Sequence, residues 1–441
     1  MKALSLNSQI LRLAIPSILA NITIPLVGVV DTAIVGHISS ATAIGGIAIG
    51  TMLFDLLYWN FGFLRVGTSG MTAQAFGRGD RLECARLLSQ SLGIALLGAA
   101  FLWLIQWLFV SAVLAIVPCS PEVSVFARNY FFIRIWAAPG TLSLMAFKGW
   151  FIGMQDTISP MITDIVVNLV NIFASYFLAV HTPIGALGVA YGTLLAQFSG
   201  LCVALAIFFF KYQSIWQGVS LWRLAIDGQG MRRLLSLNGN LFIRSLCFMV
   251  VYVGFTSLAS KYGDVELAVS SILMKLFMIF SYFVDGFAYA GEALVGKEIG
   301  SSDPRLSPLV SRLSPLVSRL FVWSLAVGLL FTVLFYVFEQ SLYQFMTSDA
   351  VVLTRLADYT FWLVAMPIVS TLAFMWDGVY TGATAGVQIR NGMIYAALSF
   401  VLCYLATFWW LGIQGLYIAY FAHLLARVLY LTFAWKKVAP F

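Results

Sequence analysis

The chain has 441 residues, of which 61% are hydrophobic and only 10% are charged, and its mean hydropathy is +0.93. Soluble domains carry about 25% charged residues, so this composition excludes an ordinary soluble protein and indicates a membrane protein. The net charge of +7 does not require a nucleic-acid partner, because basic loops that face anionic lipid headgroups produce the same excess.

Apolar runs of membrane-spanning length recur along the whole sequence. A spanning helix needs about 20 mostly apolar residues, and these runs are too long and too uniform for the alternating strands of an outer-membrane barrel. The fold class is therefore predicted to be an all-α membrane protein with twelve transmembrane helices, at 7–37, 46–76, 88–117, 124–150, 160–181, 186–210, 234–259, 265–296, 320–345, 352–382, 389–410 and 412–435.

Lysine and arginine residues concentrate in the termini and the even-numbered loops, and only Arg128, Lys261 and Arg355 fall on the other side. Because basic loops stay in the cytoplasm, we expect a multi-pass protein of the inner membrane with both termini cytoplasmic. No cleavable signal peptide is expected, since the first helix begins near Met1 and has no A-x-A site behind it. The spacing of the five cysteines predicts neither a disulfide framework nor a zinc site.

The first predicted helix contains the segment PLVGVVDTAIVG (25–36), in which Asp31 is the only charged residue between Leu13 and Phe54. An acid at a helix centre costs about 2.5–3.5 kcal/mol on insertion scales, so it normally faces a partner or a wet cavity. Burial disfavours the charged carboxylate, which favours proton exchange near neutral pH. Pro25 and two flanking glycines allow the helix to bend. The pattern predicts a chemiosmotic coupling site; the alternative is a permanently protonated acid that hydrogen-bonds a neighbouring helix.

The longest polar break divides the predicted helices six and six. We therefore expect an N-terminal six-helix bundle at 1–210, a cytoplasmic linker at 211–233 and a C-terminal six-helix bundle at 234–441. This arrangement suggests duplication, with the two copies in the same orientation around an axis along the membrane normal and a cleft between them.

Two echoes support duplication. The fourth helix has Pro139 followed by Gly149 and Gly153, and the tenth helix has the same pattern in MPIVSTLAFMWDGVYTG (366–382); AQAFGRGD (73–80) resembles GKEIGSSD (296–303). The two offsets, about 229 and 223 residues, nearly agree. The alternative is that glycine and proline simply recur in membrane helices, where small residues help packing.

The segment RLSPLVS at 305–311 is repeated without change at 312–318. A proline every seven residues opposes a continuous helix, so we expect a tandem insertion in a cytoplasmic loop, where extra residues are tolerated. A functional motif there is the alternative.

The sequence lacks H-E-x-x-H, G-x-S-x-G, Walker A and dinucleotide-binding motifs, so no enzyme is expected; a membrane-embedded enzyme or scaffold remains the non-transport alternative. The candidate chemistry lies in sparse ionisable residues inside the predicted helices. They are Asp31, Asp55, Arg65, Arg134, Lys148, Asp164, Arg244, Lys275, Asp285, Glu292, Asp377 and Arg427. Some of them are expected only to neutralise each other.

The segment PLVGVVDTAIVGHI (25–38) resembles the first helix of the multidrug and toxic compound extrusion (MATE) transporters, especially their DinF-like branch. Further matching segments are LRVGTSGMTAQAFG (64–77), NLVNI (168–172), GALGVAYGT (185–193), DGFAYAGEALVG (285–296) and WDGVYTGAT (376–384). The resemblance spans nearly the whole chain. It implies an antiporter that expels amphipathic or cationic compounds as protons or sodium ions enter, with small organic substrates and lipid as partners, no nucleic acid and no cofactor, in a monomer.

The resemblance also implies a cation-coupling site. The matching positions are Asp31, Asn171 and Thr193, whereas Ser175 stands where the branch carries a second acid. Asn171 and Ser175 lie one helical turn apart and share a face; ordinary interhelical hydrogen bonding is the alternative role for each. Since one carboxylate remains, we expect protons as the coupling ion, with sodium as the alternative.

The second half contains Lys275, Asp285, Glu292 and Asp377, which we expect to hold a cationic substrate or to form a second proton site. A salt bridge between Lys275 and one of these acids is the alternative. Aromatic residues attract organic cations, so cleft lining is considered, beside packing or lipid contact, for Tyr58, Trp59, Phe283, Phe287, Tyr289, Trp376 and Tyr380. A flippase of lipid-linked intermediates is a further alternative and requires a cleft rich in cationic residues.

Overall fold

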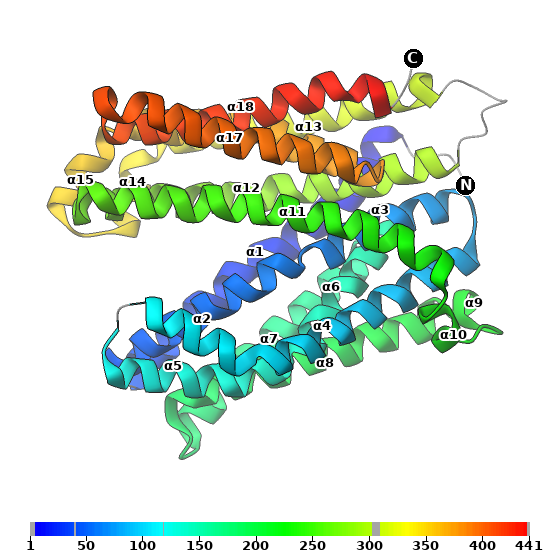
Figure 1. The fold of residues 1–441 in the computed structure, drawn as a ribbon, viewed down its shortest axis with the longest axis horizontal. Helices are drawn as coiled ribbons and strands as arrows, with labels where there is room; N and C mark the ends of the chain where they lie inside the picture. Colours follow the sequence, from blue (N-terminus) through cyan, green and yellow to red (C-terminus); the bar gives the residue numbers. More distant parts are fainter. Residues whose placement is uncertain (1–4, 39–40, 118, 302–308, 439–441) are drawn as a thin grey trace. The chain divides into compact units, whose positions relative to one another are not determined.

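The computed structural model describes residues 5–38, 41–117, 119–301 and 309–438, except for some side chains within these ranges. The described residues form helices joined by turns and include no strand (Figure 1). The α-helices are α1 (Leu6–Ile38), α2 (Ala41–Tyr58), α3 (Phe63–Gly77), α4 (Arg81–Ile116), α5 (Pro121–Arg134), α6 (Ala138–Gly153), α7 (Ile158–His181), α8 (Gly188–Lys211), α9 (Gln213–Trp216), α10 (Leu221–Ala225), α11 (Gly228–Ala259), α12 (Asp264–Gly300), α13 (Leu309–Val337), α14 (Glu339–Met346), α15 (Ala350–Ala357), α16 (Thr360–Gly382), α17 (Gly386–Leu411) and α18 (Ile413–Val438).

Eleven segments of the described chain are long and apolar enough to cross a membrane. Two of them join consecutive α-helices through a single 3-10 turn, at Trp59–Phe61 between α2 and α3 and at Ile135–Ala137 between α5 and α6. Together with α1, which has 33 residues, they correspond to the twelve predicted spans. The predicted all-α membrane fold is confirmed.

The ninth helix departs most from the predicted spans. Instead of 320–345, α13 covers Leu309–Val337, and the separate short helix α14 follows it. The second copy of RLSPLVS, at 312–318, therefore lies inside a helix, and the prediction of a loop is wrong for this copy. Most of the first copy lies outside the described residues.

The seven-residue repeat keeps one apolar face in register along α13, which explains why the helix continues through Pro315. Leu313, Leu316 and Leu320 are buried at the i, i+3, i+7 spacing of a packed helical face. Pro315 removes a single backbone donor from the helix, and the packing of the leucines outweighs that loss.

The chain forms two compact units. The C-terminal unit comprises Met1–Ile18 and Ser236–Phe441, and the N-terminal unit comprises Leu19–Leu235. These limits differ from the expected bundles of 1–210 and 234–441, because the first turns of α1 group with the C-terminal unit and the linker groups with the N-terminal unit.

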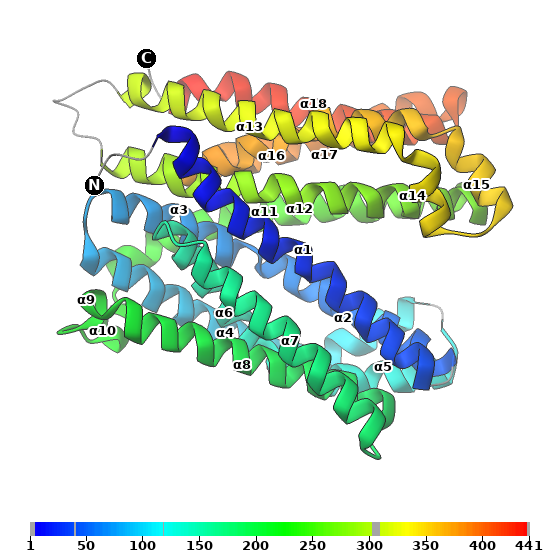
Figure 2. The ribbon, with the colours of Figure 1, turned by 180° about the vertical axis from the view of Figure 1, so that it is seen from behind.

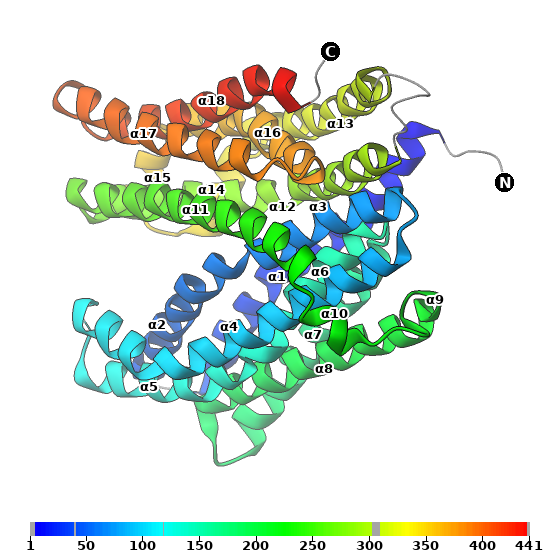
Figure 3. The same cartoon turned by 45° about the vertical axis from the view of Figure 1, so that its right-hand side comes forward.

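Specific contacts explain both differences. Gly286 of α12 approaches the backbone oxygen of Ala14 so closely that an added Cβ would lie 2.9 Å from it. In the linker, Oδ2 of Asp227 forms an ion pair with Nε of Arg86 on α4 at 3.0 Å. The backbone oxygen of Asp227 accepts a hydrogen bond from Gln90 at 2.9 Å. Figure 3 shows α10 beside α4. The linker is therefore docked on its own unit.

The two units repeat one helix contact residue by residue. In the N-terminal unit, a Cβ on Gly149 of α6 would overlap the backbone oxygen of Arg65 on α3; in the C-terminal unit, a Cβ on Gly378 of α16 would overlap that of Ala288 on α12. The glycines are 229 residues apart and their partners 223 residues apart, which are the two offsets found in the sequence. The predicted duplication is confirmed.

Candidate functional site

A buried polar contact joins α7 and α8 in the N-terminal unit. Asn171 and Ser175 of α7 are 3% and 0% exposed, and a Cβ on Gly192 of α8 would overlap the Ser175 hydroxyl, so the two helices lie close together as small residues allow. Asn171 donates through Nδ2 to Oγ1 of Thr193 on α8 at 3.0 Å. The structure thus brings together Asn171, Ser175 and Thr193.

The hydrogen bonds around Thr193 fix the orientation of the Asn171 amide. The Thr193 hydroxyl donates to the backbone oxygen of Val189 at 3.0 Å, so its oxygen can only accept from Asn171. Oδ1 of Asn171 therefore points away from Thr193. Among the described residues, neither this atom nor Oγ of Ser175 has a hydrogen-bond partner, although both are buried. An unsatisfied buried polar group costs about 1–3 kcal/mol. Both oxygens can therefore gain from a proton donor or a cation.

Asp31 belongs to α1, but its side chain lies outside the part of the chain that the structure describes. The position of its backbone follows from a neighbouring contact, in which Asn168 of α7 donates to the hydroxyl of Thr23 on α1. Figure 2 shows α1 and α7 running in the same direction. At 1.5 Å per residue, residue 31 lies about 12 Å beyond Thr23 and Ser175 about 10.5 Å beyond Asn168. The backbone of residue 31 is therefore close to the level of Ser175.

Pro25 is half-buried and lies inside the continuous helix α1, between Thr23 and residue 31. Its ring supplies no backbone N–H, so the helix lacks one hydrogen bond at this point, which is a common cause of bending. Thr23 and Asn168 were not among the predicted site residues; the signal that could have found Asn168 is its spacing of three residues from Asn171.

Two of the predicted acids of the C-terminal unit, Asp285 and Asp377, lie near the same arginine, Arg427. Asp377 of α16 forms ion pairs with Arg244 of α11 at 2.5 Å and with Arg427 of α18. Arg427 is 3% exposed. The carboxylate of Asp285 on α12 also interacts electrostatically with the Arg427 guanidinium group. Two guanidinium groups from different helices therefore neutralise Asp377.

Lys275 and Glu292 lie elsewhere on α12. Lys275 is exposed, and none of the ion pairs among the described residues includes it, so the salt bridge considered from the sequence is not found there. Glu292 is 3% exposed. Its backbone lies against α16, because a Cβ on Gly382 of α16 would lie 2.6 Å from the backbone oxygen of Glu292.

Three of the candidate aromatic residues serve packing. Phe287, Trp376 and Tyr380 are buried, and the two residues of α16 also bond α18: Trp376 donates to Oγ1 of Thr432 at 3.0 Å and Tyr380 donates to the backbone oxygen of Leu431 at 2.5 Å. Trp59 is exposed, whereas Tyr58, Phe283 and Tyr289 are half-buried.

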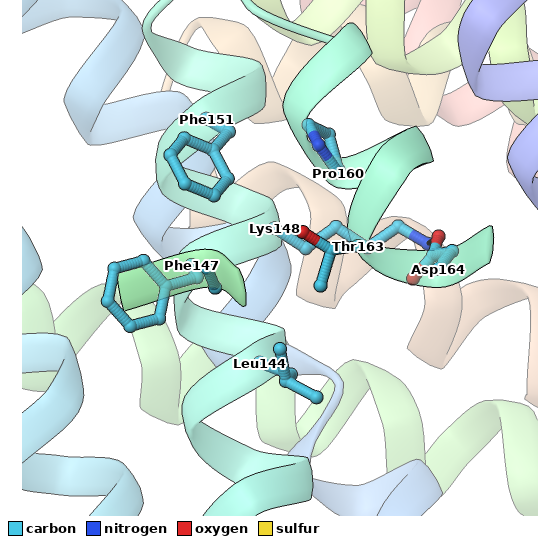
Figure 4. A pocket seen from close by; sticks show the side chains of 8 residues that line it. Leu144, Phe147, Lys148, Phe151, Pro160, Thr163 and Asp164 are labelled. Carbon is cyan, nitrogen blue, oxygen red and sulfur yellow. Dashed lines mark hydrogen bonds and ion pairs between the residues drawn. The ribbon is translucent and has the colours of Figure 1, made fainter. Parts of the chain in front are cut away.

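A second polar group of the N-terminal unit joins α6 to α7. Lys148 donates through Nζ to Oδ2 of Asp164 at 2.7 Å. The pair borders a small pocket between α6, α7 and α8. Figure 4 shows Lys148 reaching from α6 toward Asp164 on α7. The pocket is lined by Leu144, Phe147, Lys148, Phe151, Pro160, Thr163, Asp164 and Ala204.

A different network lies in the turn between α6 and α7, outside the spanning segments. Asp156 accepts hydrogen bonds from Lys211 and Tyr212, each at 2.7 Å, and from Ser159. Burial raises the pKa of Asp156, but the hydrogen bonds from Lys211, Ser159 and Tyr212 outweigh it and hold the pKa below its ordinary value. Burial and the neighbouring carboxylate raise the pKa of Tyr212. This network fastens the turn to the end of α8.

Two related helical units, a membrane-spanning length for their helices and a buried polar contact inside one unit define a multi-pass membrane protein with the architecture of a transporter. The MatE family model matches residues 16–177 and 241–409, and the chain belongs to this family of multidrug and toxin extrusion transporters.

Known proteins agree with this assignment. The chain is 34% identical to DNA damage-inducible protein F of Escherichia coli strain K12, over 98% of this chain and 93% of the relative. It is 26% identical to the chloroplastic protein DETOXIFICATION 44 of Arabidopsis thaliana, over 98% and 82%. Crystal structures of MATE in the straight and the bent conformation share its fold, with TM-scores of 0.87 and 0.86 at 16% identity; each covers 98% of this chain, which in turn covers 96% and 95% of them.

Proposed function

We propose that this protein is a proton-coupled antiporter that exports amphipathic or cationic compounds by alternating access, with Asp31 as the coupling acid. Asn171, Ser175 and Thr193 form the remainder of the cation-coupling site. The protein works as a monomer in the inner membrane with both termini in the cytoplasm, and it needs no cofactor.

The observation that carries this proposal is a pair of buried oxygens, Oδ1 of Asn171 and Oγ of Ser175, that have no hydrogen-bond partner among the described side chains. Oδ1 can only accept a hydrogen bond, and a carboxylate has no proton to donate. A protonated Asp31 at the level of Ser175 has the O–H donor that this acceptor lacks. Protonation is therefore stabilised in a conformation that brings Asp31 to α7.

The same oxygens also bear on the choice of ion. Sodium is best held by several oxygens with net negative charge, whereas this cluster offers neutral oxygens and, with Asp31, a single carboxylate. One titratable acid is enough for a proton. Sodium coupling remains the competing outcome of the experiment below.

In the proposed cycle, protonation of Asp31 from outside removes its charge, α1 bends near Pro25, and the cavity of the N-terminal unit contracts and releases the substrate. Rocking of the units then exposes the site to the cytoplasm, where the proton leaves. One charge that crosses about 100 mV supplies about 2.3 kcal/mol. The related MATE that has been solved in straight and bent conformations supports a bending step.

The experiment uses purified protein in liposomes and follows a fluorescent organic cation under imposed proton or sodium gradients. We expect the proton gradient alone to drive transport, and we expect Asp31→Asn to lower it at least tenfold because the variant cannot exchange the proton. The thermal unfolding midpoint should stay within a few degrees of wild type. Full transport by Asp31→Asn would refute the coupling role, and transport driven by sodium alone would refute the choice of ion.

A further inference from the structure

We propose that Asp164, held by Lys148, is a second proton-carrying group of the N-terminal unit. The inference rests on the proposed proton coupling at Asp31 and adds a titratable residue to that path. It is carried by three observations: the face of α7 on which Asp164 lies, the partners of that face and the pocket beside the ion pair.

Asp164 lies on the same face of α7 as the coupling cluster. Asp164, Asn168, Asn171 and Ser175 are spaced by four, three and four residues, which places them within an arc of about 60° at 100° per residue. We call this set the polar face of α7. The opposite face is apolar and exposed, through Ile158, Ile162, Ile165, Leu169 and Phe173.

Each contact of the polar face reaches a different helix. Asp164 pairs with Lys148 of α6, Asn168 bonds Thr23 of α1, and Asn171 bonds Thr193 of α8. The face extends about 16.5 Å along α7, at 1.5 Å per residue, from Ser175 toward the end of the helix at Ile158. It therefore connects the level of Asp31 with the region of the pocket.

Asp164 is the only acid in α7. Amides and hydroxyls hydrogen-bond a proton carrier but do not take up its charge near neutral pH, so a proton that leaves the coupling cluster along this face finds one group able to bind it. Ser175 occupies the position at which a second acid was expected from the resemblance, and Asp164 supplies a carboxylate on the same face three turns away.

The ion pair of Asp164 and Lys148 is partly exposed and borders the pocket. The side chain of Asp164 is 24% exposed and that of Lys148 is 19% exposed, and the pocket beside them also contains the hydroxyl of Thr163. Three of the residues that line the pocket are polar, Lys148, Thr163 and Asp164, and they lie together at one side of an otherwise apolar lining. The residue of α8 that lines the pocket is Ala204, which carries no charge. Asp156, which precedes α7, is paired with Lys211.

The proton balance is simple. The Asp164 carboxylate accepts a proton and forms an O–H bond, its charge is lost, and the ion pair with Lys148 opens. When the O–H bond breaks, the proton leaves and the ion pair with Lys148 forms again.

A purely structural pair that ties α6 to α7 is the competing role, and a charge swap separates the two. The variants are Asp164→Asn and the double change Lys148→Asp with Asp164→Lys, tested in the same liposome assay. The matched control is Asp156→Asn, because Asp156 also binds a lysine at 2.7 Å but lies outside the polar face. Each rate is expressed per folded molecule, and the substrate Kd and the unfolding midpoint are measured in detergent.

We expect Asp164→Asn to lower proton-driven transport at least tenfold with a substrate Kd within twofold of wild type. The swap should restore the unfolding midpoint but not transport, because the carboxylate has left α7. Asp156→Asn should lower the midpoint and keep transport. In wild type the rate should fall as the pH on the release side falls, and this dependence should be weaker in Asp164→Asn, in which Asp31 alone still releases a proton.

Two results would overturn the assignment: transport by Asp164→Asn within twofold of wild type, or recovery of transport by the swap. If Asp164→Asn does not fold, the neutral pair Lys148→Gln with Asp164→Asn is held to the same criterion. Loss of transport in Asp31→Asn together with full transport in Asp164→Asn rejects only this inference, whereas full transport in Asp31→Asn rejects the proposed function itself.

Discussion

The two halves of the molecule keep the same backbone contact but carry opposite charges beside it. Lys148 precedes Gly149 in α6, and Asp377 precedes Gly378 in α16, at the same offset of 229 residues. Lys148 pairs with one acid at the edge of a pocket, with both side chains partly exposed. Asp377 is held by two arginines, one of which is almost fully buried.

The comparison shows which features survive duplication. A glycine whose Cβ would meet a backbone atom has no acceptable replacement, so both copies retain it. Charged side chains tolerate change as long as each charge keeps a partner, and here the sign has been inverted. The result is a partly exposed pair of Lys148 with one acid in the N-terminal unit, and an Asp377 held by two arginines in the C-terminal unit.

The largest effect is expected from removing the buried arginine of the C-terminal unit. Arg427→Leu leaves Asp377 with one guanidinium instead of two in a buried site, which costs about 3–5 kcal/mol. Lys148→Leu in the other unit should cost about 1 kcal/mol, because its pair is partly exposed and solvent screens it. Thermal unfolding in detergent measures both changes, and adding Asp377→Asn to Arg427→Leu should recover part of the loss. Equal losses in the two units would remove the distinction drawn here.

The next effect tests the shared contact itself. Gly149→Ala and Gly378→Ala each place a Cβ against a backbone oxygen of the facing helix, so each should cost about 1–3 kcal/mol through overpacking. Gly93→Ala in α4 is the control, because a Cβ there meets nothing within 4 Å and alanine is the better helix former by about 1 kcal/mol. The unfolding midpoint should fall in the first two variants and hold or rise in the third. If the unfolding midpoint does not fall in one of the two variants, Gly149 and Gly378 do not make equivalent contacts.

The sequence was sufficient for the spans and the duplication because both depend on local patterns. Apolar length identifies spanning helices. The glycines that match between the halves, Gly149 and Gly378, are the ones that contact α3 and α12. The start of α13 was missed because a proline pattern suggests a loop, while the buried leucines that hold this segment are recognised only when their neighbours are known. The grouping of the first turns of α1 with the C-terminal unit depends on Gly286, which no local pattern marks.

The candidate site was predictable only where a motif fixed it. The family resemblance brought Asn171, Ser175 and Thr193 into one hypothesis, and the structure places them at one contact. The pairing of Asn168 with Thr23 depends on the register of α1 against α7, and the arginine pairs of Asp377 depend on three helices meeting. Neither is encoded in the spacing of residues along one helix.

The smallest effect concerns the turns that follow the shared glycine contact. Gln155 and Thr384 have φ values of 63° and 53° at matching positions, but Asp156 follows the first and Ala385 the second, so only the N-terminal unit fastens its turn with a carboxylate. Because the pKa of Asp156 is lower in the folded protein than the ordinary value of about 3.9, its stabilisation is present above about pH 4 and is lost as the pH falls through the folded-state pKa. Asp156→Asn should therefore lower stability by about 1 kcal/mol at pH 7, and the gap to wild type should close in acid. Unfolding midpoints of the two proteins between pH 7 and pH 3 test this, and a gap that stays constant over that range would mean that the charge of Asp156 does not contribute.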